Sequence, residues 1–251
     1  MTDVIDAQPL TRLAVRDATA TVARTFPVRR IYCVGRNFAG HAREMGAPVA
    51  TCAADRGSPV FFCKPADALV LNGVVPYPGG TRELHHEVEL VVAIGRDASA
   101  GVVAVAEAQA LVYGYAVGLD LTRRDLQAAA KTRGLPWDTG KAFDHSAPIS
   151  ELVPAADAGD LAAHTLSLQV NGELRQHASL RDLVWTVPEI LHELSKLFAL
   201  RAGDLVFMGT PAGVGPLLPG DRFAAQLNGV VGFSGRVVAT DAFRAMSLAT
   251  L

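Results

Sequence analysis

The stretch HHEVELVVAIG, residues 85–95, decides the fold of this chain of 251 residues. It is typical of a buried strand, with two glutamates, Glu87 and Glu89, set one residue apart beside an apolar run. Side chains alternate across a strand, so we expect the two glutamates to share one face and Val88 and Leu90 to take the other. Carboxylates are rarely buried unless they are paired or bound to a cation. Their position in an apolar strand therefore requires an explanation.

A second apolar strand, YGYAVGLD at residues 113–120, ends in Asp120. Three carboxylates directed at one interior point would need a cation, and an oxygen-only site favours Mg²⁺ or Mn²⁺. The alternative is that Glu87 and Glu89 lie on a solvated strand face, as polar residues of antiparallel strands often do. The neighbouring His86 does not indicate zinc, because no HExxH motif or Cys/His spacing accompanies it.

Composition indicates a compact globular protein, since 50% of the residues are hydrophobic and 19% are charged. The net charge of −2 is mixed along the chain, so we expect neither a nucleic-acid partner nor an anionic membrane surface. No apolar run suggests a signal peptide or a membrane span. Cys33, Cys52 and Cys63 are odd in number and lack metal or redox spacing, which predicts reduced thiols, in or near the core, of a cytoplasmic protein.

Residues 1–27 are expected to form a mobile N-terminal extension, and residues 28–251 a single catalytic domain. RRIYCVG, at 29–35, predicts a strand that leads into a helix over 38–46, with Asn37 as its N-cap. Within that helix His41 and Glu44 are three residues apart and so share a face.

After the second strand, Thr122 and Asp125 resemble a capping box that starts a helix, and Gly134 would end it. The second half of the chain favours strands, because Asn-Gly pairs at 171–172 and 228–229 lie between apolar runs and predict hairpins. PEILHELSKLF, at 188–198, predicts a helix with proline in its first turn. Together these patterns predict one β-rich α+β domain with peripheral helices.

The glycine-rich stretch GTPAGVGPLLPG, at 209–220, lacks the GK[ST] ending of a phosphate-binding loop. Its prolines prevent an immediate following helix, so we expect a rigid turn. Such a turn can still present a backbone amide or the Thr210 hydroxyl to a substrate carboxylate, and its glycines permit close approach.

Seven segments in fixed order resemble the fumarylacetoacetate hydrolase (FAH) superfamily over about residues 30–237: CVGRNFAGHAREMG, FFCKPADA, HHEVEL, GYAVGLDLTRRDLQ, GLPWDTGKAFD, LQVNGELRQ and GDLVFMGTPAGVGP. Within it the chain most resembles the bacterial fumarylpyruvate hydrolases of gentisate breakdown, with acylpyruvases and oxaloacetate decarboxylases as near relatives. The resemblance implies a mixed β-sandwich roll, a homodimer, a divalent metal (Mg²⁺ or Mn²⁺) and a small-molecule 2,4-diketo acid as substrate.

The resemblance also implies roles for individual residues. It places the metal on Glu87, Glu89 and Asp120, and a water-activating dyad on His41 and Glu44. The implied polar substrate contacts are Arg124, Gln127, Lys141 and Thr210, of which Lys141 would stabilise a developing oxyanion. The residues alone leave other interpretations open: His41 and Glu44 as an exposed helix pair, and Lys141 and Arg124 as surface charges over apolar neighbours.

Three functions are compatible with these residues. The first is hydrolysis of a carbon–carbon bond in fumarylpyruvate, giving fumarate and pyruvate, or in another acylpyruvate. The second is decarboxylation of oxaloacetate, which passes through the same pyruvate enolate. The third is a non-catalytic role, because a fold does not fix a function. A fumaryl substrate carries a second carboxylate, for which the candidate partners are Arg36, Lys64, Arg123 and Arg133.

Overall fold

The fold is taken from a computed structural model that describes residues 4–5, 9–16, 22–44 and 53–248, without the side chains of 41–43, 53, 54, 244, 247 and 248. Its strands are β1 (Arg12–Val15), β2 (Arg24–Pro27), β3 (Arg30–Gly35), β4 (Val60–Lys64), β5 (Leu69–Val70), β6 (Val74–Pro76), β7 (Leu84–His86), β8 (Val88–Ile94), β9 (Val112–Leu119), β10 (Thr122–Arg123), β11 (Ala147–Pro148), β12 (Val153–Pro154), β13 (Thr165–Val170), β14 (Glu173–Ser179), β15 (Asp204–Phe207), β16 (Gly215–Pro216), β17 (Arg222–Leu227) and β18 (Val231–Val238). The α-helices are α1 (Ala39–Glu44), α2 (Val105–Ala108), α3 (Arg124–Arg133), α4 (Asp138–Lys141), α5 (Ala155–Ala158), α6 (Val187–Ser195) and α7 (Thr240–Leu248).

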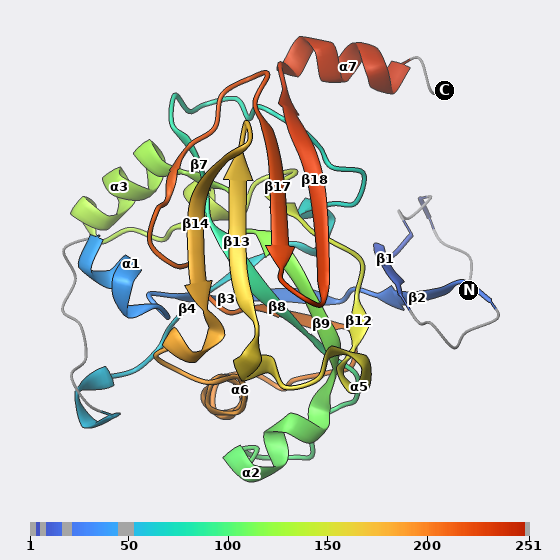
Figure 1. Cartoon of the computed structure of the whole chain (residues 1–251), viewed down its shortest axis with the longest axis vertical. Helices are drawn as coiled ribbons and strands as arrows, with labels where there is room; N and C mark the ends of the chain where they lie inside the picture. Colours follow the sequence, from blue (N-terminus) through green and yellow to red (C-terminus); the bar gives the residue numbers. More distant parts are fainter. Residues whose placement is uncertain (1–3, 6–8, 17–21, 45–52, 249–251) are drawn as a thin grey trace.

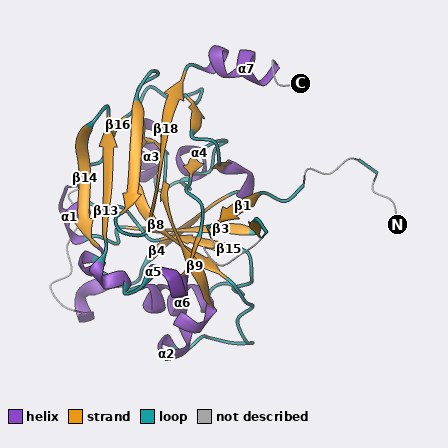
Figure 2. Cartoon of the chain, turned by 45° about the vertical axis from the view of Figure 1, so that its right-hand side comes forward, coloured by secondary structure: helices purple, strands orange, loops and turns teal. Residues whose placement is uncertain are grey.

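Two mixed sheets form the body of the molecule. The larger has six strands in the order β12-β9-β8-β15-β3-β4, and the smaller has five in the order β14-β13-β17-β18-β6. Figures 1 and 2 show the five-stranded sheet standing across the six-stranded one, with α2, α5 and α6 gathered at one end. The fold is thus a β-rich roll with peripheral helices, as the sequence predicted.

Strand β8 is buried along its whole length, which explains its nearly continuous apolar run. Leu90 and Val92 enter the core between the sheets, whereas Val91 and Ala93 enter a second core on the opposite face. The predicted alternation is therefore confirmed. The predicted single strand over 85–95 is interrupted, because β7 and β8 are separate strands with Glu87 between them.

The first 27 residues contain the antiparallel pair β1 and β2, and this pair packs on the fold. Leu13 is 1% exposed and Phe26 is 7% exposed, and both belong to the second core. Val15 also bridges to Leu152, so these strands are held against the body of the molecule.

Both predicted Asn-Gly hairpins are present, between β13 and β14 and between β17 and β18. Helix α6 begins after Thr186, whose capping box with Glu189 adds to the predicted proline, and Gly134 ends α3 in the left-handed conformation. The stretch 209–220, expected to be a turn only, includes the short strand β16.

Two predicted helix starts are wrong. Asn37 does not cap α1, because its side-chain amide bonds to the backbone of Trp185 and Met208. The Thr122 capping box is absent, since Thr122 lies in β10 and the carboxylate of Asp125 accepts hydrogen bonds from Thr81 and Arg82. In both cases partners distant in sequence replace the local cap.

The cysteine prediction holds only in part. Cys33 is buried and free, but Cys63 is free and exposed, beside the buried Lys64 in β4. Cys52 and the predicted end of the first helix at residues 45–46 lie outside the described residues. Among the described residues, no helix is long and apolar enough to cross a membrane.

Candidate active site

Strands β8 and β9 bring the three predicted carboxylates together. They pair antiparallel with Val88 opposite Leu119, so the residue before β8 lies beside the residue after β9. The Asp120 backbone N–H donates to the Glu87 carbonyl at 2.8 Å. One carboxylate oxygen from each of Glu87, Glu89 and Asp120 lies within 4.8 Å of the others. The solvated-face alternative is therefore wrong, since these residues are only 5%, 1% and 1% exposed.

Three cationic side chains surround this cluster. Lys141 Nζ lies 2.8 Å from Glu87 Oε2 and 2.5 Å from Asp120 Oδ2. Lys64 Nζ lies 2.9 Å from Asp120 Oδ1, and Arg124 Nη2 lies 2.5 Å from Glu87 Oε1. Three formal negative charges are thus matched by three positive ones. The alternative that Lys141 is a surface charge is wrong, because the residue is 2% exposed.

Helix α4 carries Lys141 into the cluster by packing closely on α3. A Cβ added to Gly140 would lie 3.0 Å from the Gln127 backbone nitrogen, so a larger residue would push the two helices apart. Burial alone would lower the pKa of Lys141, but Asp120 and then Glu87 outweigh burial and raise it. Lys141 is therefore a charged ammonium, as oxyanion stabilisation would require.

The remaining carboxylate, Glu89, is held by the loop that follows β15. Gly209 has a φ of +92°, and its backbone N–H donates to Glu89 Oε2 at 2.7 Å. A Cβ at Gly209 would lie 2.8 Å from Asn37 Cβ, so the position combines backbone strain with steric conflict for any other residue. Burial first, and then Asp120 and Glu87, raise the pKa of Glu89 well above its usual value.

The donor set fits a hard divalent cation. All three side chains offer oxygen, the ligand type that Mg²⁺ and Mn²⁺ prefer. Asp120 Oδ1 is buried and has no hydrogen bond of acceptable geometry, although the Lys64 ammonium is close enough to form an ion pair. A buried carboxylate oxygen without a hydrogen bond is costly unless another cation binds it. Glu87, Glu89 and Asp120 are thus the residues that could hold the metal.

Gln176 contacts the site but was not predicted from the sequence, although it is the last residue of LQVNGELRQ, at 168–176. Its Oε1 accepts from the Val88 backbone N–H at 3.0 Å, and its Nε2 donates to Thr210 Oγ1 at 2.8 Å. The side chain is 1% exposed. It thereby ties β14 of the smaller sheet to the start of β8 and to the loop that carries Thr210.

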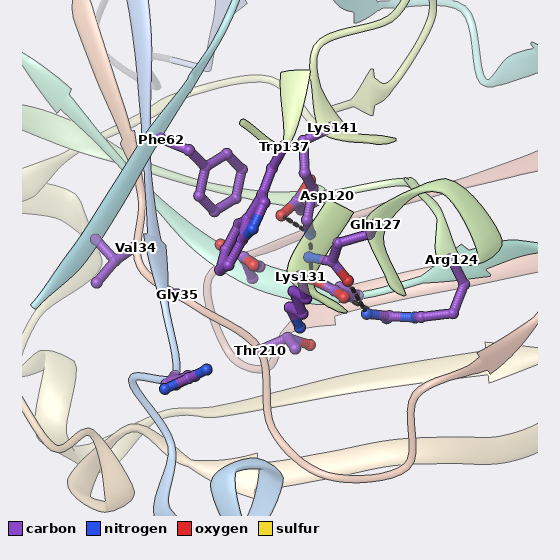
Figure 3. Close-up of a pocket in the computed structure, with 13 residues that line it drawn as sticks. Val34, Gly35, Phe62, Asp120, Arg124, Gln127, Lys131, Trp137, Lys141 and Thr210 are labelled. Atoms are coloured by element: carbon purple, nitrogen blue, oxygen red, sulfur yellow. Dashed lines mark hydrogen bonds and ion pairs between the residues drawn. The ribbon is translucent and has the colours of Figure 1, made fainter. Parts of the chain in front are cut away.

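A cavity of about 140 Å³ opens beside the carboxylates (Figure 3). It contains the predicted substrate contacts Arg124, Gln127, Lys141 and Thr210, of which Arg124 Nη1 donates to Gln127 Oε1 at 2.6 Å. Figure 3 shows Trp137 beside Phe62 on one wall, and their ring centroids are 5.9 Å apart. The full lining is Val34, Gly35, Arg36, Phe62, Glu87, Glu89, Asp120, Arg124, Gln127, Lys131, Trp137, Lys141 and Thr210.

The predicted dyad is placed only in part. Glu44 is the last residue of α1, and its carboxylate oxygens lie 3.2 and 3.3 Å from the Gly213 backbone nitrogen, whose N–H donates to them. This bond joins α1 to the same loop that carries Gly209 and Thr210. Glu44 does not line the cavity, and the side chain of His41 lies outside the described residues.

Of the four candidate partners for a second substrate carboxylate, only Arg36 lines the cavity. Lys64 is a wrong candidate, because it is buried and donates to the carbonyls of Leu121 and Lys141. Arg123 stacks over Phe143, 4.4 Å from its ring centroid, and lines a different cavity. Arg133 is exposed at the end of α3 and does not line the site.

Comparison with known proteins agrees with this fold and site. The model of the fumarylacetoacetate (FAA) hydrolase C-terminal family matches residues 30–238. The chain therefore belongs to the fumarylacetoacetate hydrolase family, and within it lies close to the fumarylpyruvate hydrolases.

Two solved structures illustrate this. Fumarylpyruvate hydrolase from Pseudomonas aeruginosa, solved with Mn²⁺ and pyruvate, has a TM-score of 0.84 and 44% identity, covering 95% of this chain and 100% of that one. A putative fumarylpyruvate hydrolase from Burkholderia cenocepacia has a TM-score of 0.84 and 47% identity, covering 95% of this chain and 99% of that one.

Curated relatives carry a different activity. Oxaloacetate tautomerase YcgM of Escherichia coli is 42% identical over 206 residues, which are 81% of this chain and 90% of that protein. A mitochondrial oxaloacetate tautomerase of Mus musculus is 42% identical over 212 residues, covering 83% of this chain and 91% of that protein. The family is thus shown, and its members differ in reaction.

Proposed function

We propose that this protein is a metal-dependent hydrolase that cleaves a carbon–carbon bond of a 2,4-diketo acid, with fumarylpyruvate as substrate and fumarate and pyruvate as products. The observation that carries the proposal is the buried group of Glu87, Glu89 and Asp120 beside a cavity that contains Lys141. The similarity to the P. aeruginosa enzyme, solved with Mn²⁺ and pyruvate, supports both the metal and the product class.

The charges of the site suit such a substrate. Lys64, Lys141 and Arg124 already balance the three carboxylates, so a bound divalent cation would leave two positive charges in excess. The carboxylate of a 2,4-diketo acid can neutralise one of these charges, and the adjacent oxygen can neutralise the second when the substrate is in its enolate form. The cation would supply Lewis acidity that stabilises negative charge developing on the substrate.

The chain's own residues would supply the remaining steps. Glu44 accepts from the Gly213 N–H outside the cavity lining, so it would have to move toward the cavity to take, assisted by His41, a proton from the water that adds to the distal keto carbon. The bond between that carbon and the neighbouring methylene carbon then breaks, and its electron pair stays with the pyruvate fragment as an enolate. The enolate carbon takes a proton to give pyruvate, and the other fragment leaves as fumarate. Lys141 would stabilise the oxyanion formed by water addition.

Oxaloacetate tautomerisation is the second candidate, because curated relatives 42% identical to this chain carry that activity. It moves one proton between carbon and oxygen and needs no water. Decarboxylation of oxaloacetate and hydrolysis of other acylpyruvates are further alternatives on the same site. The homodimer, the cytoplasmic location, the gentisate pathway and a catalytic unit over residues 28–251 stay predictions.

Steady-state turnover of purified protein separates these functions. Fumarylpyruvate, acetylpyruvate and oxaloacetate would each be supplied with Mn²⁺, with Mg²⁺ and with EDTA. We expect metal-dependent turnover with the highest kcat/KM for fumarylpyruvate. Faster enolisation or decarboxylation of oxaloacetate, without cleavage of either acylpyruvate, would reject the hydrolase in favour of the second candidate.

A further inference from the structure

Part of the cavity lining has no role in the proposed chemistry. Val34, Phe62 and Trp137 form an apolar and aromatic wall, in which the Phe62 and Trp137 ring centroids are 5.9 Å apart. Two cationic side chains, Arg36 and Lys131, also line the cavity. Neither is a member of the charge-balanced carboxylate cluster.

Arg36 and Lys131 come from separate elements. Arg36 follows β3 and has a φ of +60°. This backbone conformation is uncommon for residues other than glycine, and such strained positions are found most often at functional sites. The turn is fixed by its neighbour Asn37, whose amide donates to the Met208 carbonyl at 2.8 Å. Lys131 lies in the last turn of α3, with its Nζ 5.0 Å from the centroid of the Trp137 ring.

Within the described part of the chain, neither cation has a carboxylate at ion-pairing distance. Both residues are exposed on the surface of the chain, yet partial burial lowers the pKa of Lys131, and the charges of Arg124, Lys141 and Arg36 lower it further, whereas Glu87 raises it. Two positive side chains that line one cavity, and that have no ion-pair partner among the described residues, favour an anionic ligand, because such a ligand relieves their repulsion.

We propose that Arg36 and Lys131 form a second subsite that binds the distal carboxylate of the substrate, so that the enzyme selects dicarboxylic over monocarboxylic 2-oxo acids. This inference rests on the proposed function and specifies its substrate class. The planar, conjugated part of a fumaryl group would lie along the wall formed by Phe62 and Trp137, with its carboxylate at the two cations. Acetylpyruvate lacks that carboxylate.

Two unreactive probes isolate the distal contact. 2-Oxoheptanedioate and 2-oxoheptanoate have the same carbon chain and differ only in the distal carboxylate, and neither has a second keto group to be attacked. Calorimetric titration of each into Mn²⁺-loaded protein gives the ratio of their affinities. We expect wild-type protein to bind the diacid on the order of tenfold or more tightly, because only the diacid can form a charge-assisted hydrogen bond at its distal end.

The variants Arg36→Gln and Lys131→Gln are each expected to lose most of this preference, while Lys131→Arg retains it. Arg133→Gln is the matched control, because Arg133 lies two residues further along α3 and outside the cavity. A variant that folds poorly would lower binding of both probes, so the ratio separates misfolding from loss of the contact. Equal affinity of wild-type protein for both probes, or an unchanged ratio in both glutamine variants, would overturn the subsite.

Turnover distinguishes failure of the subsite from failure of the proposed function. If wild-type protein cleaves neither fumarylpyruvate nor acetylpyruvate, the hydrolase is rejected while the probe titrations still decide the subsite. If both are cleaved, the ratio to compare is kcat/KM for fumarylpyruvate divided by kcat/KM for acetylpyruvate. A fall in this ratio on the order of tenfold in Arg36→Gln would show that the subsite acts in catalysis. An unchanged ratio of kcat/KM would count against it.

Discussion

Lys64 Nζ lies 2.9 Å from Asp120 Oδ1, and both side chains are almost completely buried. Lys64 ends β4, next to β3, whereas Asp120 follows β9 on the far side of β8 and β15. The ammonium also donates to the Leu121 and Lys141 carbonyls. Lys64 thus holds together the segments that carry the proposed metal site, behind the cavity rather than within it.

Replacing Lys64 by methionine would remove the ion-pair partner of the buried Asp120 Oδ1 and leave Lys141, at Oδ2, as the carboxylate's remaining cation. We expect the free energy of unfolding, measured by urea denaturation in EDTA, to fall by about 3 kcal/mol. Adding Mn²⁺ should recover part of this loss, because a cation binds the folded state only. The control Lys196→Met removes an exposed ion pair with Glu193 and should change stability by less than about 1 kcal/mol. Equal effects of the two variants would contradict the structural role of Lys64.

The Asp120→Asn variant tests the proposed metal ligands. An amide keeps the shape of the side chain but removes its charge, so we expect the affinity for Mn²⁺, measured by calorimetry, to fall on the order of 10²-fold. Asp138→Asn changes an exposed carboxylate in α4 and serves as the control. Unchanged Mn²⁺ affinity in Asp120→Asn would reject the three-carboxylate site.

Glu44→Gln separates metal binding from water activation. We expect kcat for fumarylpyruvate to fall on the order of 10²-fold or more, because the amide cannot accept a proton, while Mn²⁺ affinity stays at the wild-type value. The amide oxygen can still accept the hydrogen bond from the Gly213 N–H, so the loop should keep its position. Wild-type turnover in this variant would exclude Glu44 as the general base.

Gly209→Ala tests the loop that holds Glu89. The new Cβ would lie 2.8 Å from Asn37 Cβ at a φ of +92°, so we expect a loss of about 2 kcal/mol or more in the free energy of unfolding. Mn²⁺ affinity should fall with it, since the Gly209 N–H orients Glu89. Gly79→Ala is the control, because no atom lies within 4 Å of its added Cβ. Similar stability of the two variants would contradict the tight packing at Gly209.

The sequence predicted the parts of the site that depend on local periodicity. The alternation expected over residues 85–95 placed Glu87 and Glu89 on one face, and the pairing of β8 with β9 brings Asp120, which follows β9, beside them. The sequence did not predict the contacts of Lys64 with Leu121 or of Gln176 with Val88, because these partners lie 57 and 88 residues apart along the chain.

The same physical reason explains the wrong helix starts. Asp125 has the spacing of a capping residue, but Thr81 and Arg82 offer it tertiary hydrogen bonds instead. Lys131 and Trp137 were not predicted as cavity residues, since their approach depends on the angle between α3 and α4, which no local pattern determines.

The most direct measurement of the central claim is the fate of water oxygen during turnover of fumarylpyruvate. Mn²⁺-loaded protein and EDTA-treated protein would each be incubated with the substrate in ¹⁸O-enriched water, and the products analysed by mass spectrometry. Metal-dependent hydrolysis predicts release of pyruvate together with fumarate that carries at least one heavy oxygen, and neither product in EDTA. Absence of fumarate from the Mn²⁺-loaded reaction, or equal release in EDTA, would contradict the account.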